Sequence, residues 1–417
     1  MVASIRSETI ALCTEKLHIG DSYEGIREIS KQLNPLNIKI LSMMEKLGPR
    51  NLLEVSRQCN IPFTTVYHRV AQLEARALPV HEVAILSPTV AKLGLVRCIQ
   101  LVTSKAGEEE TVTRALKLPN MWRVVERCEG AFTHHAIQLV PANQLQEFNW
   151  YAKALEDRGM IRSHRLILTG DTIPCFPDFS SYDPLTREWL FSWDKWFEEL
   201  KTANPSRTIS DQADAPIQFD AVDLQIVAYL ELNSRTPFTE IAKKIGVSPQ
   251  TVKYRYDTKL VPMGVAEHFL FDVMPYPVEM IAPHEVMLEF NDPQSLNKFY
   301  SLIKKLFFVI NVSKVRQANT LFVSTWIPNQ MVSRMFEFFS AMAKADLLES
   351  YSSVRLNFSR RNYQTISPEI FDNDTKTWQF NPERCLLEIQ APPVIEKGDP
   401  REPLVSSEDP RVYRPLD

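Results

Sequence analysis

The stretch VDLQIVAYLELNSRTPFTEIAKKIGVSPQTVKYRY, residues 222–256, decides the fold because the chain contains a second version of it. It aligns without a gap with LNIKILSMMEKLGPRNLLEVSRQCNIPFTTVYHRV, residues 36–70, at an offset of 186 residues. Six positions are identical and the apolar positions agree nearly throughout. Self-similarity at a fixed offset indicates one supersecondary unit present twice.

Each version is expected to form three helices joined by short turns. Ser248 is a good N-cap, and Pro249 suits the first helical position because its missing N–H would be unpaired there. Gly246, and Asn60 in the first version, fall in the short turn where a left-handed residue is needed. The pattern predicts a helix-turn-helix, with the second version's helices near 220–232, 238–245 and 248–260.

The third helix of the second version is predicted to turn a polar ridge away from its core. Wound at 100° per residue, Val252, Tyr256 and Leu260 share one stripe with Pro249. Gln250 and Tyr254 fall opposite this stripe, with Lys253 on one edge and Arg255 on the other. Hydrogen-bonding groups between cations can read base edges while holding phosphates.

The third helix of the first version, residues 61–76, repeats this layout. Phe63, Val66, Val70 and Leu73 are expected to face its core. The residues expected to contact DNA are Thr64, Thr65, Tyr67, His68 and Arg69 in the first version and Gln250, Thr251, Lys253, Tyr254 and Arg255 in the second.

Segments after each helix-turn-helix repeat as well. Strand and helix patterns alternate in the order β-α-β-β-α-β, which is the ferredoxin-like split pattern. The expected elements are 94–104, 108–118, 121–130, 132–140, 142–158 and 162–170, then 284–290, 293–306, 308–317, 320–327, 329–345 and 349–358. The fold class is therefore α+β, with two winged-type helix-turn-helix domains that are each followed by a ferredoxin-like domain.

Two related aromatic segments, YDPLTREWLFSW and FDNDTKTWQFNP, follow the α/β blocks and are expected to cover an open sheet face or to dock a partner. The expected divisions are an N-terminal helical segment (1–30), helix-turn-helix 1 (31–79), ferredoxin-like domain 1 (80–171), aromatic extension 1 (172–201), a linker (202–218), helix-turn-helix 2 (219–262), ferredoxin-like domain 2 (263–359), aromatic extension 2 (360–390) and a Pro-rich tail (391–417).

Composition restricts the class of protein. The 417 residues are 44% hydrophobic and 24% charged, which is typical of a soluble globular chain of several domains. The net charge of −4 means that any nucleic-acid surface must be a local patch. The six cysteines form no C-x-x-C pair, and we find no signal sequence or membrane-length apolar run, so a cytoplasmic protein is expected. No glycine-rich phosphate loop occurs, and no cofactor is predicted.

The helix-turn-helix at 219–255, the KLGL motif at 92–95 and the repeated α/β block resemble the Lrp/AsnC (leucine-responsive/asparagine-regulator) family of transcription factors. The resemblance implies a DNA-binding regulator that does not act as an enzyme, with double-stranded DNA as partner. It also implies dimers or higher homo-oligomers that form through the ferredoxin-like domains, and contact with the transcription machinery. Because the two predicted ridges differ, we expect an asymmetric or pseudo-palindromic site.

The resemblance fails at one point. The family's second α/β strand ends in a glycine turn followed by an acidic residue, near the amino-acid effector site. Here the corresponding segments are EGAFTHH, 129–135, and QANTLFV, 317–323, and neither has the acid. The resemblance therefore does not extend to sensing an ordinary amino acid.

Three alternatives stay open. Sirohaem decarboxylases are similar in their two-domain plan, so the chain could be a tetrapyrrole enzyme. Its candidate residues would be His134, His135, His164 and Arg165. The neighbouring His134 and His135, however, should point to opposite faces of a strand. Zinc could use Cys128, His134 and Cys175, although the spacing is unlike that of structural sites. A protein-interaction scaffold could dock through the aromatic extensions.

Overall fold

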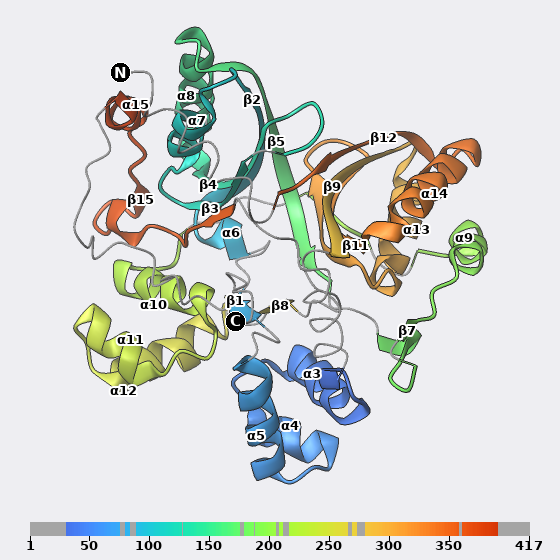
Figure 1. The fold of residues 1–417 in the computed structure, drawn as a ribbon. Coiled ribbons are helices and arrows are strands. Elements are labelled where there is room, and N and C mark those ends of the chain that lie inside the picture. The colour runs from blue at the N-terminus through green and yellow to red at the C-terminus, as the bar shows by residue number, and fades with distance from the viewer. Residues whose placement is uncertain are drawn as a thin grey trace, which may run out of the picture.

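A computed structural model describes residues 31–75, 80–83, 89–126, 128–175, 179–186, 188–205, 208–211, 217–265, 269–272, 280–357 and 361–390. The fold combines helices with an antiparallel sheet, as expected for the α+β class (Figure 1). The expected N-terminal segment and Pro-rich tail lie outside these residues.

Two three-helix units lie below the main sheet in Figure 1. Unit 1 consists of α3 (Pro35–Leu47), α4 (Leu52–Cys59) and α5 (Phe63–Glu74). Unit 2 consists of α10 (Ala221–Leu232), α11 (Phe238–Ile245) and α12 (Pro249–Arg255), after which a π-helical turn spans Tyr256–Leu260.

The predicted turn chemistry is present in both units. Asn60 and Gly246 adopt left-handed conformations, with φ of 52° and 75°, at the ends of α4 and α11. The Ser248 hydroxyl accepts a hydrogen bond from the Thr251 N–H at 3.0 Å, and this bond caps α12. The third helix of unit 2 therefore begins at Pro249, as predicted, whereas α5 begins at Phe63, after the predicted start at residue 61, and has no side-chain cap.

Two β-α-β-β-α-β segments follow the units. The first half contains β2 (Leu95–Ser104), α7 (Glu109–Leu116), β3 (Met121–Glu126), β4 (His134–Pro141), α8 (Leu145–Asp157) and β5 (Ile161–Pro174). The second half contains β9 (Ile281–Phe290), α13 (Pro293–Leu302), β10 (Val309–Val315), β11 (Thr320–Pro328), α14 (Val332–Lys344) and β12 (Leu348–Arg355).

The two halves share one nine-stranded sheet, ordered β12-β9-β11-β10-β5-β2-β4-β3-β13. The end of β5 pairs with β10, where Thr172 lies opposite Ser313. In turn, β13 (Arg361–Tyr363), which follows the second half, pairs with β3 of the first. The boundary expected at residue 171 is therefore wrong, because it falls inside a strand that joins both halves.

The strands that were expected to form a wing on each unit pair differently from the prediction. β1 (Val80–Val83) pairs antiparallel with β8 (Phe269–Asp272), so the strand after unit 1 pairs with the strand after unit 2. Within the described residues, these two strands form a shared ribbon in place of a separate two-stranded wing for each unit.

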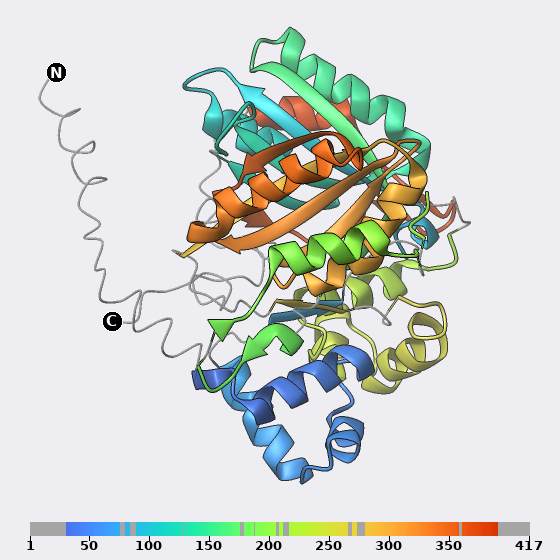
Figure 2. The same cartoon turned by 90° about the vertical axis from the view of Figure 1, so that its right-hand side faces the viewer.

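The aromatic extensions cross between the halves. In extension 1, the hairpin of β6 (Tyr182–Asp183) and β7 (Glu188–Trp189) leads into α9 (Trp193–Thr202). Trp189 stacks on Phe307 at 4.4 Å between ring centroids, and Trp196 packs in the core of the second half. The extension that follows the first half therefore covers the second (Figure 2).

Extension 2 does the reverse. The hairpin of β14 (Phe371–Asp372) and β15 (Thr377–Trp378) leads into α15 (Pro382–Gln390), which lies beside α7 and α8 in Figure 1. The Trp378 indole donates a hydrogen bond to the Leu93 carbonyl at 2.6 Å, and Phe380 packs on Phe148 and Tyr151. The extensions thus pack against helices and link the halves, whereas a cover for an open sheet face was expected.

Candidate nucleic-acid interface

The outer face of α12 has the polar ridge that the sequence predicts. Val252 is fully buried, whereas Gln250, Lys253 and Tyr254 are exposed, and Tyr254 exposes 68% of its surface. Lys253 forms an ion pair with Asp257 one turn later, so its ammonium is partly neutralised. An amide and a phenol therefore stand at the centre of this ridge, where they could reach base edges.

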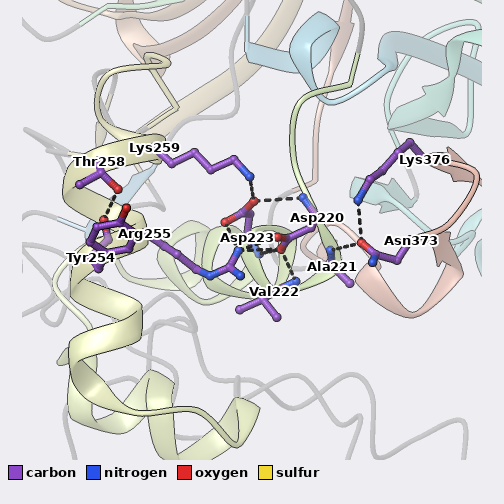
Figure 3. A network of polar contacts seen from close by, with 10 residues as sticks. All are labelled: Asp220, Ala221, Val222, Asp223, Tyr254, Arg255, Thr258, Lys259, Asn373 and Lys376. Carbon is purple, nitrogen blue, oxygen red and sulfur yellow. Dashed lines mark hydrogen bonds and ion pairs between the residues drawn. The ribbon is translucent and has the colours of Figure 1, made fainter.

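Arg255 does not lie on the open edge of this ridge, and that part of the prediction is wrong. Its Nη1 donates to Asp220 Oδ2 and Asp223 Oδ1, each at 2.7 Å (Figure 3). Asp223 is fully buried and also pairs with Lys259. The guanidinium therefore ties α12 to the start of α10, and the sequence could not tell this edge from an open one.

Electrostatics of this network favour the charged forms. Burial acts to raise the pKa of Asp220, but hydrogen bonds from Arg255 and the Asp223 backbone outweigh burial, so the pKa is lowered. The pKa of Arg255 is raised, chiefly by its hydrogen bond to Asp220. The start of α10 is held further by Asn373 of extension 2, which accepts from the Ala221 N–H at 3.2 Å (Figure 3).

Arg69 occupies the corresponding place in unit 1. Its Nη1 donates to Asn37 Oδ1 at 2.9 Å and reaches Asn34 Oδ1 at 3.5 Å. Arg69 lies 186 residues before Arg255, and its acceptors Asn34 and Asn37 lie 186 residues before Asp220 and Asp223. Both units therefore have the same clamp, in which an arginine of the third helix binds two residues at the start of the first helix. In unit 1 the two acceptors are uncharged. Arg69 is therefore also turned inward, contrary to the prediction.

The other residues that were predicted to contact DNA differ in how exposed their side chains are. Thr65 and Thr251 are half-buried, and the Thr251 hydroxyl lies 2.8 Å from that of Ser248. The predicted residues that remain exposed on the two ridges are Thr64, Tyr67, His68, Gln250, Lys253 and Tyr254.

Sequence reasoning missed two cations and misplaced one aromatic residue. Lys243 and Lys244 are exposed in the last turn of α11, and neither forms an ion pair with any described residue. Because α11 packs against α12, these two cations lie near the polar ridge of unit 2. Phe63, which was expected in the core of unit 1, exposes 44% of its surface.

Contacts between the units fix their relative placement. Arg50 of unit 1 donates to the Ser234 carbonyl at 2.6 Å, and its guanidinium lies 4.2 Å from the ring centroid of Phe238. In the other direction, Arg235 of unit 2 forms an ion pair with Glu74 of α5 at 2.6 Å. The loops after the first helices of both units thus hold α5 and α12 in one arrangement.

The candidate enzyme residues are not brought together. His134 points toward the helices, with Nε2 3.1 Å from the Thr113 hydroxyl, whereas His135 lies 3.9 Å from Glu285 of the second half. The expected opposite orientation is thus present, and burial lowers the pKa of His135 to about 3. His164 contacts Glu156 on α8 at 3.2 Å, and Arg165 is exposed.

The proposed zinc ligands do not cluster either. Burial raises the pKa values of Cys128 and Cys175 to about 12, which disfavours the thiolate forms that bind metals. Among the described residues there is no group of three or more His, Cys, Asp or Glu side chains placed to hold a metal ion.

Comparison with known proteins supports a regulator. The family model for the AsnC-type helix-turn-helix domain matches residues 219–258. The HTH-type transcriptional regulator LysM of Sulfurisphaera tokodaii is 43% identical over 53 residues, which cover 13% of this chain and 37% of that protein. This chain therefore spans little more than a third of that relative. Unit 2 is an AsnC-type helix-turn-helix associated with DNA-binding transcription regulation.

Solved structures show only distant likeness. The siroheme decarboxylase NirDL superposes with a TM-score of 0.49 at 13% identity, covering 84% of this chain and 97% of that chain. AsnC of E. coli superposes with a TM-score of 0.27 at 19% identity, covering 33% of this chain and 91% of that chain.

In the described part of the chain, no helix has the length and apolar character required to cross a membrane.

Proposed function

We propose that this chain is a sequence-specific, DNA-binding transcriptional regulator of the Lrp/AsnC type. The proposal rests chiefly on one observation: residues 219–258 match the AsnC-type helix-turn-helix, and their third helix turns Gln250 and Tyr254 into solvent. A third helix of this kind enters the major groove with its first residues against the bases.

We further propose that one chain contains two such regulators in tandem. Two three-helix units, two β-α-β-β-α-β segments and two crossed extensions support this interpretation. Reciprocal strand pairing of β5 with β10 and of β13 with β3 is what two subunits related by a twofold axis would make. The chain then presents two non-identical reading helices to an asymmetric or pseudo-palindromic site. It acts in the cytoplasm, and further chains and the transcription machinery are its candidate protein partners.

A salt titration of duplex binding tests the proposal. Sites would first be obtained by unbiased selection from random duplexes, and affinity would then be measured by fluorescence anisotropy between 50 and 200 mM salt. A DNA reader loses affinity steeply, with a slope of log K against log salt of about −0.9 per phosphate contact. Replacing Lys243 and Lys244 together by Ala should weaken binding to all duplexes and should make this slope shallower by about 2.

Base reading requires a separate variant. Gln250→Ala should change the preferred base at one position by about 1–3 kcal/mol and leave the salt slope unchanged. Arg334→Ala, which removes an exposed arginine from α14, is the matched control and should alter neither quantity. If no duplex is selected, or if the lysine variant binds with an unaltered slope, unit 2 is not the DNA-binding element.

The tetrapyrrole alternative can be tested on the same preparation. Absorbance spectra of the protein would be recorded with increasing iron-uroporphyrin, and we expect no saturable shift of the porphyrin band. A saturable shift that His135→Ala abolishes would favour the enzyme.

A further inference from the structure

The outer face of unit 1 differs in chemistry from that of unit 2. Phe63 and Tyr67 lie one turn apart on α5, with ring centroids 6.2 Å apart, and expose 44% and 50% of their surfaces. The residues 186 positions later are Pro249 and Lys253, so α12 has no such aromatic pair. The pair also lies at the start of the third helix, the part that would lie closest to the bases in the proposed function.

The ridge of unit 1 is also poor in cations. Arg69 is the only Lys or Arg within Phe63–Glu74, and its guanidinium is bound to Asn37 and Asn34. Arg and Lys are the side chains that best read guanine, through its O6 and N7 atoms. In its described conformation, α5 therefore offers no cationic group for reading guanine.

One base has an apolar group in the major groove. The C5 methyl of thymine is contacted by apolar and aromatic side chains in direct readout. Phe63 and Tyr67 offer such a surface, while Thr64 and His68, both exposed on the same helix, can hydrogen-bond to neighbouring base edges.

We propose that unit 1 selects a thymine-containing half-site through contact of Phe63 and Tyr67 with thymine methyl groups. Unit 2 reads the other half-site with its polar ridge. This inference rests on the proposed function. It adds that unit 1 contacts thymine methyl groups, whereas unit 2 reads its half-site with polar side chains.

Replacing thymine by deoxyuridine tests the idea, because it removes the methyl group and keeps the pairing. In a selected duplex, the thymines of one half-site at a time would be replaced, and affinity would be measured by anisotropy. Removing each contacted methyl should weaken binding about fourfold, the effect of one methyl leaving water. The loss should occur in one half-site and be small in the other.

Variants assign the effect to a helix. In Phe63→Ala and in Tyr67→Ala, the deoxyuridine penalty should shrink, whereas in Tyr254→Ala, the matched control on α12, it should persist in full. All three side chains expose at least 44% of their surfaces, so the variants should fold, which circular dichroism would verify.

Different failures can be told apart. Equal affinity for thymine and deoxyuridine duplexes in both half-sites overturns this inference and leaves DNA binding intact. A penalty that persists in both unit 1 variants also overturns it. If these variants instead alter the oligomeric state in light scattering while duplex affinity is unchanged, the aromatic pair docks a second chain. Absence of binding to any duplex overturns the proposed function itself.

Discussion

Asp223→Ala should open unit 2 locally while unit 1 stays closed. The Asp223 carboxylate is fully buried and accepts from Arg255 at 2.7 Å, from Lys259, and from the Asp220 N–H at 3.0 Å. Removing one partner of a buried ion pair costs about 3–5 kcal/mol. Because Arg255 and Lys259 keep 26% and 31% exposure and can regain water, we expect the lower end, about 3 kcal/mol.

Hydrogen exchange is the suitable assay, because unfolding of such a large chain is not expected to be two-state. Under conditions in which exchange reports the opening equilibrium, about 3 kcal/mol corresponds to a loss of protection of about 100-fold. The loss should be confined to peptides from α10, α11 and α12. Asp223→Asn keeps an acceptor for Arg255, as Asn37 does for Arg69, so it should cost about 1 kcal/mol, or about fivefold in protection.

The matched control is Asn37→Ala, which should lower protection in α3, α4 and α5 only. The reasoning is refuted if Asp223→Ala and Asp223→Asn reduce protection equally, because the neutral acceptor that Asn keeps would then contribute nothing to the clamp. It is refuted equally if protection of α10 does not change in the Ala variant.

Three further outcomes are expected. Arg50→Ala removes one of the contacts that hold the units together, so affinity for a two-half-site duplex should fall while affinity for either half-site alone is kept, as measured by anisotropy. Because the pKa of Asp220 is lowered in the folded state, its stabilisation is present above its ordinary pKa of 3.8 and is lost as pH falls through the lowered value. Hydrogen exchange below pH 4 should therefore show unit 2 opening before unit 1, which has the neutral Asn34 at that position. Trp378→Phe leaves the Leu93 carbonyl without its indole donor and should destabilise the start of β2 by about 1–3 kcal/mol, seen as faster exchange there.

Local features of the fold could be predicted because they depend on neighbouring residues. Ser248 caps α12, and Asn60 and Gly246 adopt left-handed conformations, since these properties belong to single side chains and short turns. The alternation of strand and helix patterns likewise gave most elements near their observed bounds. Sequence and structure therefore agree on the cap of α12, on the turns and on the order of strands and helices.

Long-range partners could not be predicted in the same way. A helical projection places Arg255 beside the polar ridge, but it does not say that the side chain reaches Asp220 on another helix. The sequence did contain a signal for this contact. Residues with side-chain acceptors, Asn or Asp, stand 32 and 35 positions before the arginine in both units. Nothing in the extension sequences, by contrast, says that Trp189 packs on the second half or that Trp378 packs on the first.

The crossed contacts bear on how a regulator of this plan could discriminate its sites. Arg50 with Ser234 and Arg235 with Glu74 hold the two units together, and the shared β1–β8 ribbon joins the strands that follow them. A fixed arrangement of two reading helices permits only a narrow range of half-site spacings, since misplacing one helix removes all of its contacts at once. Two chemically different ridges then also fix the direction in which the site is read. A symmetric homodimer cannot distinguish the two orientations of its site, whereas a single chain with an aromatic ridge on one unit and a polar ridge on the other can.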